Sequence, residues 1–158
     1  MDWQEVCKHP SLKDLPFRIE LNETGQIVMS PVSILHSLYS GKIGNLLISF
    51  LKNGEILSEC AIRTEKGTKV ADVAWISPER LKLILHEFDS PIAPEICVEV
   101  LSESNTDDEM RTKRRLYFET GALEVWICDQ NGNMFFYRPD KQIKFSELVP
   151  DFPKKIGI

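Results

Sequence analysis

The fold is decided by residues 94–121, PEICVEVLSESNTDDEMRTKRRLYFETG, which place an apolar strand directly before a strongly capped helix. Apolar residues surround Glu99 on both sides, a pattern typical of a strand that is covered on both faces in a parallel or mixed sheet. A carboxylate in that position needs a cation, a proton or a hydrogen-bond donor, because burying it unpaired is costly or shifts its pKa. Glu99 is therefore a candidate functional residue.

The helix that follows has a well-marked start and end. Thr106 and Glu109 are spaced as a capping box, and Gly121 is placed to end the helix in the left-handed conformation. Acidic side chains fill the first turn and basic ones follow, an order that complements the helix dipole. At about 100° per residue, Lys113 and Arg114 both flank the apolar stripe of the helix. We expect these two side chains to reach back over the sheet.

The rest of the chain supplies the other elements of that sheet. Residues 17–21 and 26–29 predict a hairpin around Gly25, and the apolar residues of 35–51 follow the spacing of a long helix. The strand, helix and strand within 95–128 predict a right-handed crossover with parallel strands. This order is typical of an α/β fold with a mixed sheet flanked by helices. Further strands are predicted at residues 55–63, 69–76, 124–129, 134–138 and 142–145.

Length and composition narrow the class of protein. A chain of 158 residues predicts one soluble domain, which we expect to span residues 1–158. The formal net charge of −5 means that a nucleic-acid partner would need a local basic patch or a metal ion. No apolar run of bilayer length and no targeting signal is found, so we expect a cytoplasmic protein without a membrane partner. No phosphate-binding glycine motif is present either, and we expect no organic cofactor.

Two acids and one lysine form a candidate catalytic set. Asp72 stands inside the apolar strand KVADVAWIS, as Glu99 does in its own strand, and Lys113 lies on a helix expected to pack over both. Carboxylates with room left for water and phosphate suit Mg²⁺ or Mn²⁺. Such an ion orients and acidifies water, and a lysine adds positive charge, so phosphodiester hydrolysis is the natural chemistry. The alternative is a structural network in which both acids pair with arginine or lysine.

Five motifs resemble the Uma-two family, which is grouped with restriction endonucleases in the PD-(D/E)XK nuclease superfamily. The resemblance covers most of the chain and implies a restriction-endonuclease-like core that acts on DNA. We expect the protein to be a homodimer. The motifs are RIELNETGQIVMSP (18–31), VADVAWIS (70–77), PEICVEVLSESN (94–105), TKRRLYFETGALEVWICD (112–129) and SELVPDFPKKI (146–156).

The resemblance also implies roles for single residues. Asp72 matches the motif aspartate and Glu99 the motif glutamate, and Val100 would offer its backbone carbonyl to the metal. The standard pattern has a lysine two residues after the acid, where this chain has Leu101. In the family the lysine has moved to the following helix, at the position of Lys113.

Three further positions have weaker assignments. Arg114 competes with Lys113 as the catalytic cation and is otherwise a candidate substrate contact. Glu20 and His36 match recurrent family positions, Glu20 as an additional metal ligand or base and His36 as a substrate contact. A structural role is the alternative for both Glu20 and His36.

The sequence therefore predicts a Mg²⁺- or Mn²⁺-dependent DNA endonuclease, in which Asp72 and Glu99 are ligands and Lys113 stabilises charge. The alternative function is a catalytically silent nuclease-fold module that binds nucleic acid or a protein partner. The two acids and the lysine favour the enzyme, whereas the acidic net charge favours the silent module.

Overall fold

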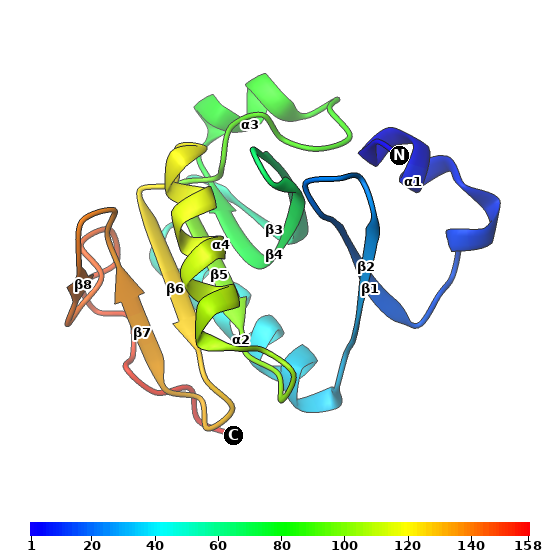
Figure 1. Cartoon of the computed structure of the whole chain (residues 1–158). Coiled ribbons are helices and arrows are strands. Elements are labelled where there is room, and N and C mark those ends of the chain that lie inside the picture. The colour runs from blue at the N-terminus through cyan, green and yellow to red at the C-terminus, as the bar shows by residue number, and fades with distance from the viewer.

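The computed structural model describes all 158 residues, and a six-stranded mixed sheet lies at its centre (Figure 1). The strand order is β3-β4-β5-β6-β7-β8, in which β5 and β6 run parallel and the other neighbours are antiparallel. The mixed-sheet α/β class expected from the sequence is confirmed. The strands are β3 (Glu55–Thr64), β4 (Gly67–Ile76), β5 (Ile96–Val100), β6 (Glu124–Cys128), β7 (Met134–Tyr137) and β8 (Gln142–Ile143).

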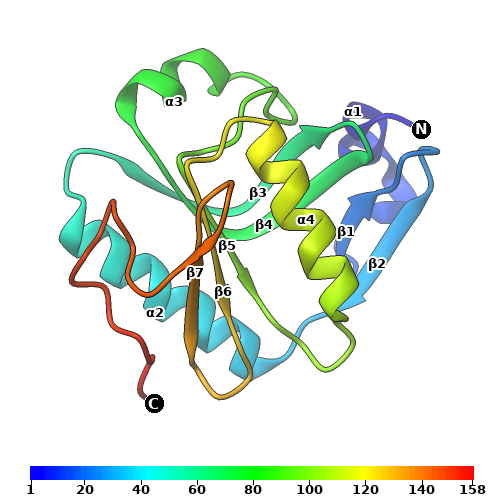
Figure 2. The ribbon, with the colours of Figure 1, turned by 60° about the vertical axis from the view of Figure 1, so that its left-hand side comes forward.

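Two long helices, α2 (Ile34–Phe50) and α4 (Asp107–Glu119), cover opposite faces of the sheet, with α4 nearer the viewer in Figure 2. The predicted capping box of α4 is present, because Thr106 accepts from the Glu109 N–H and Glu109 accepts from the Thr106 N–H. The helix ends before Gly121, whose φ of 114° is in the range that favours glycine. The shorter helices are α1 (Trp3–Lys8), the 3-10 turn Pro10–Leu12 and α3 (Pro78–Ile84).

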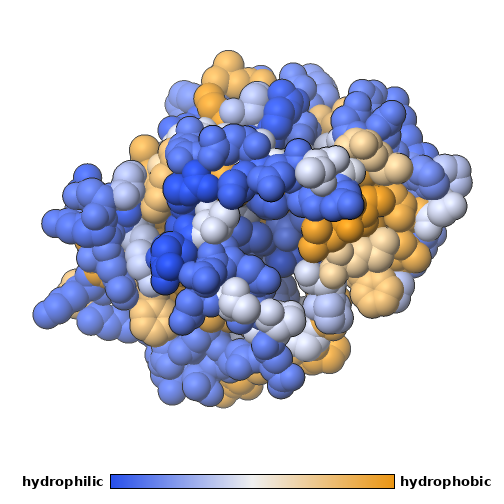
Figure 3. All heavy atoms as spheres, in the orientation of Figure 1, coloured by the Kyte–Doolittle hydropathy of each residue, from blue (hydrophilic) through white to orange (hydrophobic).

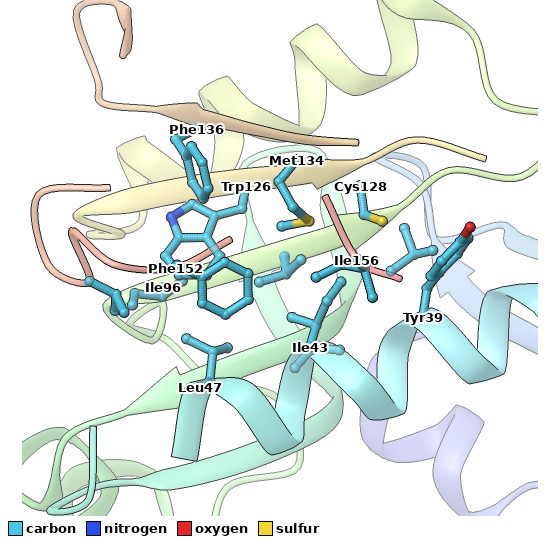
Figure 4. Packing of buried hydrophobic residues seen from close by; sticks show 14 residues of the cluster. Tyr39, Ile43, Leu47, Ile96, Trp126, Cys128, Met134, Phe136, Phe152 and Ile156 are labelled. Carbon is cyan, nitrogen blue, oxygen red and sulfur yellow. The ribbon is translucent and has the colours of Figure 1, made fainter. Parts of the chain in front are cut away.

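The larger apolar core lies between the sheet and α2 (Figure 4). Trp126 is fully buried in this core and packs edge-on against Phe136, with ring centroids 5.1 Å apart. Phe152, from the C-terminal segment, lies with its ring centroid 4.6 Å from that of Trp126. A smaller core fills the space under α4 and includes Tyr117 and Cys97. The two cores fix α2 and α4 against the strands that carry the candidate site.

The strands β1 (Phe17–Leu21) and β2 (Ile27–Pro31) form the predicted hairpin as a separate two-stranded sheet, which packs against β4. Hydrophobic side chains gather over this hairpin in Figure 3, whereas hydrophilic side chains cover most of α4. The exposed apolar residues of the hairpin include Phe17, Val28 and Met29. The hairpin thus packs against the central sheet at β4 without joining its hydrogen-bonded ladder.

The strands β4 and β5 separate where the candidate acids lie. They pair over three residues only, Val73–Trp75 with Ile96–Val98. Beyond that ladder, the Val100 N–H donates to the Asp72 side chain at 2.7 Å. We call the space between the separating strands, from Asp72 to Val100, the fork. Because no ladder crosses it, side chains from neighbouring elements must satisfy the polar groups on both sides.

One element differs clearly from the sequence-based expectation. The last hairpin is shorter, because β8 ends at Ile143 rather than near Phe145. Phe145 is instead exposed, with the ammonium of Lys154 4.2 Å from the centroid of its ring.

No helix in the structure combines the length and the hydropathy needed to cross a lipid bilayer.

Candidate active site

Asp72 lies on β4 at the start of the fork and is 3% exposed. Its Oδ2 accepts the Val100 N–H at 2.7 Å and lies 3.2 Å from His36 Nε2, while its Oδ1 is paired with the guanidinium of Arg18. Burial opposes ionisation, yet His36, Arg18 and the Val100 N–H together hold the pKa of Asp72 below its usual value. Asp72 is therefore an ionised carboxylate fixed in one orientation.

Glu99 lies on the other side of the fork, on β5, and is 2% exposed. Its Oε1 accepts the Tyr117 hydroxyl at 2.6 Å and the Lys113 ammonium at 3.3 Å, both from α4. Its Oε2 lies 3.8 Å from the guanidinium nitrogen of Arg18 that also contacts Asp72. Burial raises the pKa of Glu99 to about 7, although Lys113 acts in the opposite direction.

Lys113 is a buried residue of α4 whose ammonium pairs with two glutamates. Its Nζ lies 2.8 Å from Glu20 Oε2 on β1 and 3.3 Å from Glu99 Oε1 on β5. Burial acts to lower the pKa of the ammonium, but the charges of Glu99 and Glu20 outweigh it and the pKa of Lys113 is raised. Lys113 therefore stays charged inside the fork. Glu20 in turn accepts the Val70 N–H at 2.7 Å, which anchors β1 to β4.

Arg18 and Tyr117 complete the cluster and were missed by the sequence reasoning. The sequence carries a signal for each of them. Arg18 and Glu20 stand two residues apart in the strand RIEL, so a period of two places them on one face. Tyr117 follows Lys113 by four residues on α4, so the helical period places both on one face. The carboxylates therefore face two cations and a phenol rather than one lysine.

The structure separates the two candidate cations of α4. Lys113 enters the fork, whereas the guanidinium of Arg114 lies 4.0 Å from the ring centroid of Tyr137 on β7 and has no contact with either acid. Both side chains reach over the sheet as expected, but to different strands: Lys113 to Glu99 on β5 and Arg114 to Tyr137 on β7. His36 is placed against Asp72, and its hydrogen bond with Asp72 raises the pKa of the imidazole.

The donor atoms of the fork fit a hard divalent cation. Asp72 Oδ1 and Glu99 Oε2 both lie beside the Arg18 guanidinium, and Mg²⁺ takes one or two carboxylates together with water and substrate phosphate. The guanidinium occupies the space between these carboxylates, and no three His, Cys, Asp or Glu side chains converge closely enough to hold an ion by themselves. Val100 uses its N–H to hold Asp72, and a role for its carbonyl as a metal ligand stays a prediction.

Comparisons with known proteins agree with this architecture. A family model with the description "Putative restriction endonuclease", Uma2, matches residues 3–152. A solved structure from Anabaena variabilis, titled as a putative nuclease belonging to DUF820, superposes with a TM-score of 0.77 at 17% sequence identity. The superposition covers 98% of this chain and 94% of that one, and at this identity it shows the fold alone. A comparison with the curated proteins gave no match.

Proposed function

The chain belongs to the Uma2 family of restriction-endonuclease-like proteins, and we propose that it is a nuclease that hydrolyses DNA with Mg²⁺ or Mn²⁺. In this proposal residues 1–158 are a single PD-(D/E)XK-type domain, which acts in the cytoplasm. One observation carries it: Asp72 from β4, Glu99 from β5 and Lys113 from α4 meet in the fork. Two acids and a lysine brought together from three elements are the groups that metal-assisted phosphodiester hydrolysis uses.

The residues around the fork have separable tasks in this mechanism. The metal, when bound by Asp72 and Glu99, would supply an acidified water and offset charge on the phosphate. His36 and the Val100 N–H fix the orientation of Asp72. Glu20 Oε2 lies 2.8 Å from the Lys113 ammonium and gives it a second carboxylate partner beside Glu99. Lys113 can therefore keep its position and its positive charge when Glu99 binds the metal.

DNA as substrate and a homodimer as the active form are parts of the same proposal. The net charge of −5 repels a polyanion, so affinity must come from the metal, from local cations and from two copies acting together. Exposed apolar residues on the β1–β2 hairpin, Phe17, Val28 and Met29, support a contact with a second copy.

A catalytically silent nuclease-fold module is the second candidate. The observation in its favour is the pairing of Arg18 with both Asp72 and Glu99, because a guanidinium that neutralises two carboxylates is also how a structural network is built. Such a module would bind nucleic acid or a protein partner and release no cleavage product.

A cleavage assay with purified protein tests the enzyme against the module. We expect nicking or cleavage of duplex or branched DNA that requires Mg²⁺ or Mn²⁺, stops with chelator and disappears in Asp72→Asn.

The matched pair Lys113→Ala and Arg114→Ala tests which residue is the catalytic cation. Loss of Lys113 should slow cleavage about 10²–10³-fold, as for removal of one transition-state donor. Arg114→Ala should cleave within a few-fold of wild type, because Arg114 lies outside the fork.

One result of the cleavage assay would overturn the nuclease proposal. If the protein with bound Mn²⁺ leaves a broad panel of DNA and RNA substrates intact at low salt, the nuclease proposal is abandoned for the silent module.

A further inference from the structure

Arg18 has an unusual place for a strand residue of a peripheral hairpin. It belongs to β1, outside the central sheet, yet its side chain is only 9% exposed and enters the fork between β4 and β5. One guanidinium nitrogen, Nη1, is paired with Asp72 Oδ1 and lies 3.8 Å from Glu99 Oε2. The hairpin thus delivers a permanent cation to the space between the two proposed metal ligands, in contact with Asp72 and 3.8 Å from Glu99.

The partners of the two carboxylates show that one oxygen of each acid has no partner other than Arg18. Asp72 Oδ2 is engaged by Val100 and His36, and Glu99 Oε1 by Tyr117 and Lys113. The other oxygen of each acid, Asp72 Oδ1 and Glu99 Oε2, faces Arg18 alone. A divalent ion that took one oxygen from each acid would therefore lie close to Nη1, displaced toward Glu99 Oε2, and would collide with the guanidinium.

Two cations cannot share that position. A hard divalent ion binds carboxylate oxygens at about 2.0–2.1 Å for Mg²⁺, which leaves no room for a guanidinium nitrogen between the same two oxygens. Like charges at that range also repel strongly in a partly desolvated site. Without a divalent ion, conversely, the two buried acids need a cation such as Arg18.

We propose that Arg18 holds the place of the divalent cation between Asp72 and Glu99, and that metal binding withdraws Arg18 from this pair. This inference rests on the proposed function, because it takes these acids as the metal ligands. Arg18 is then a positioning residue that keeps the empty site assembled and lowers its affinity for metal. The long arginine side chain can withdraw while the β1–β2 hairpin stays in place.

Mn²⁺ titration by calorimetry tests the competition. Arg18→Met removes the competitor and should bind Mn²⁺ at least about tenfold more tightly than wild type. Arg18→Lys keeps the charge in a more flexible form and should fall between the two. Arg63→Met is the matched control, since it also removes one positive charge but from an exposed arginine that pairs with Asp89, outside the fork. Its Mn²⁺ affinity should stay within about twofold of wild type.

Thermal unfolding gives a readout that needs no catalysis. In chelator, Arg18→Met should melt below wild type, because its two buried acids face each other without Arg18. Added Mn²⁺ should then raise the melting temperature of Arg18→Met more than that of wild type.

The outcomes separate this inference from the proposed function. If Arg18→Met and Arg18→Lys bind Mn²⁺ no tighter than wild type, while Asp72→Asn loses binding, Arg18 does not compete and the metal site stands. If neither wild type nor any Arg18 variant binds Mn²⁺, the proposed metal-dependent function fails, and this inference fails with it.

Discussion

Glu99 and Glu124 are two buried glutamates on neighbouring parallel strands, and their surroundings differ in kind. Each is 2% exposed, Glu99 on β5 and Glu124 on β6. The Glu124 carboxylate accepts only from neutral donors: the Trp126 indole at 2.8 Å, the Ser146 hydroxyl at 2.6 Å and the N–H groups of Glu147 and Leu148 at 2.7 and 3.2 Å. These bonds fasten the C-terminal segment to the sheet.

The Glu99 carboxylate has the opposite kind of environment. Its close partners are the Lys113 ammonium and the Tyr117 hydroxyl, with the Arg18 guanidinium and the Asp72 carboxylate beside it. Backbone N–H groups cannot leave Glu124 without unfolding the segment that carries them, whereas a charged side chain can leave Glu99 and be replaced by a metal ion. Burial of an acid is therefore a weak sign of function, and exchangeable charged partners are a stronger one.

The sharpest test of this contrast substitutes each glutamate by glutamine. Glu99→Gln should reduce cleavage to the level seen with chelator, yet cost no more than about 1 kcal/mol of unfolding free energy. The reason is that Lys113 keeps Glu20 and Arg18 keeps Asp72 as partners. Glu124→Gln should cost roughly 2–4 kcal/mol, because its new amide N–H₂ would face the N–H groups of Glu147 and Leu148, or that of the Trp126 indole, which can only donate. Urea denaturation and the cleavage assay measure the two effects.

The contrast between Glu99 and Glu124 would be wrong if Glu124→Gln lost activity or Glu99→Gln lost stability. A Glu124→Gln protein that is fully stable but inactive well below its melting temperature would place β6 in the catalytic site. A Glu99→Gln protein as unstable as Glu124→Gln would show that the fork is a structural network.

Local sequence patterns predicted the elements well but could not rank the acids. The capping box of α4 and the hairpin turn at Gly25 depend on residues close in sequence, and both are present. The rule that selected Asp72 and Glu99, an acid inside an apolar strand, applies equally to Glu124 in EVWICD. What distinguishes them is supplied from far along the chain.

Those long-range partners explain what the sequence could not show. Ser146 reaches Glu124 from 22 residues away, and Arg18 reaches Asp72 from 54. The helical period alone left Lys113 and Arg114 equivalent on the flanks of the apolar stripe. The choice between them is made by Glu20 on the hairpin and by Tyr137 on β7, and neither contact is encoded in α4 itself.

The pH dependence of stability gives a second, smaller test of the contrast. Because the pKa of folded Glu99 is about 7 and that of an unfolded glutamate is 4.5, the unfolded chain loses this proton first as the pH rises. Between these two pKa values the folded protein holds a proton on Glu99 that the unfolded chain has released. The free energy of unfolding therefore falls as the pH increases within that window. Between pH 5 and 6.5, in chelator, we expect a loss of about 2 kcal/mol in wild type.

Glu99→Gln should remove that part of the slope, and Glu124→Gln should keep it because Glu99 is intact. The upper limit of pH 6.5 keeps His36 out of the measurement, since its pKa is raised and its own contribution is lost only at higher pH. Asp72 contributes stability that is lost below its usual pKa, because its folded pKa is lowered. An unchanged slope in Glu99→Gln would assign the pH dependence to other groups.

The finest test compares two hydrogen bonds of equal length. The Tyr117 hydroxyl donates to Glu99, and the Ser146 hydroxyl donates to Glu124, each at 2.6 Å. Burial keeps Tyr117 a donor, because it raises the pKa of the phenol well above its usual value. We expect Tyr117→Phe and Ser146→Ala each to cost roughly 1–2 kcal/mol of unfolding free energy, the usual effect of losing a hydrogen bond to a buried carboxylate.

The two variants should differ only in what else they change. Tyr117→Phe frees one lone pair of Glu99 in the fork, so the carboxylate is less firmly oriented and cleavage should slow several-fold. Ser146→Ala loosens the C-terminal segment, which takes no part in the fork, and its cleavage rate well below the melting temperature should equal that of wild type. Equal losses of activity in the two variants would mean that Glu99 and Glu124 belong to one network. The distinction between a functional and a structural glutamate would then be wrong.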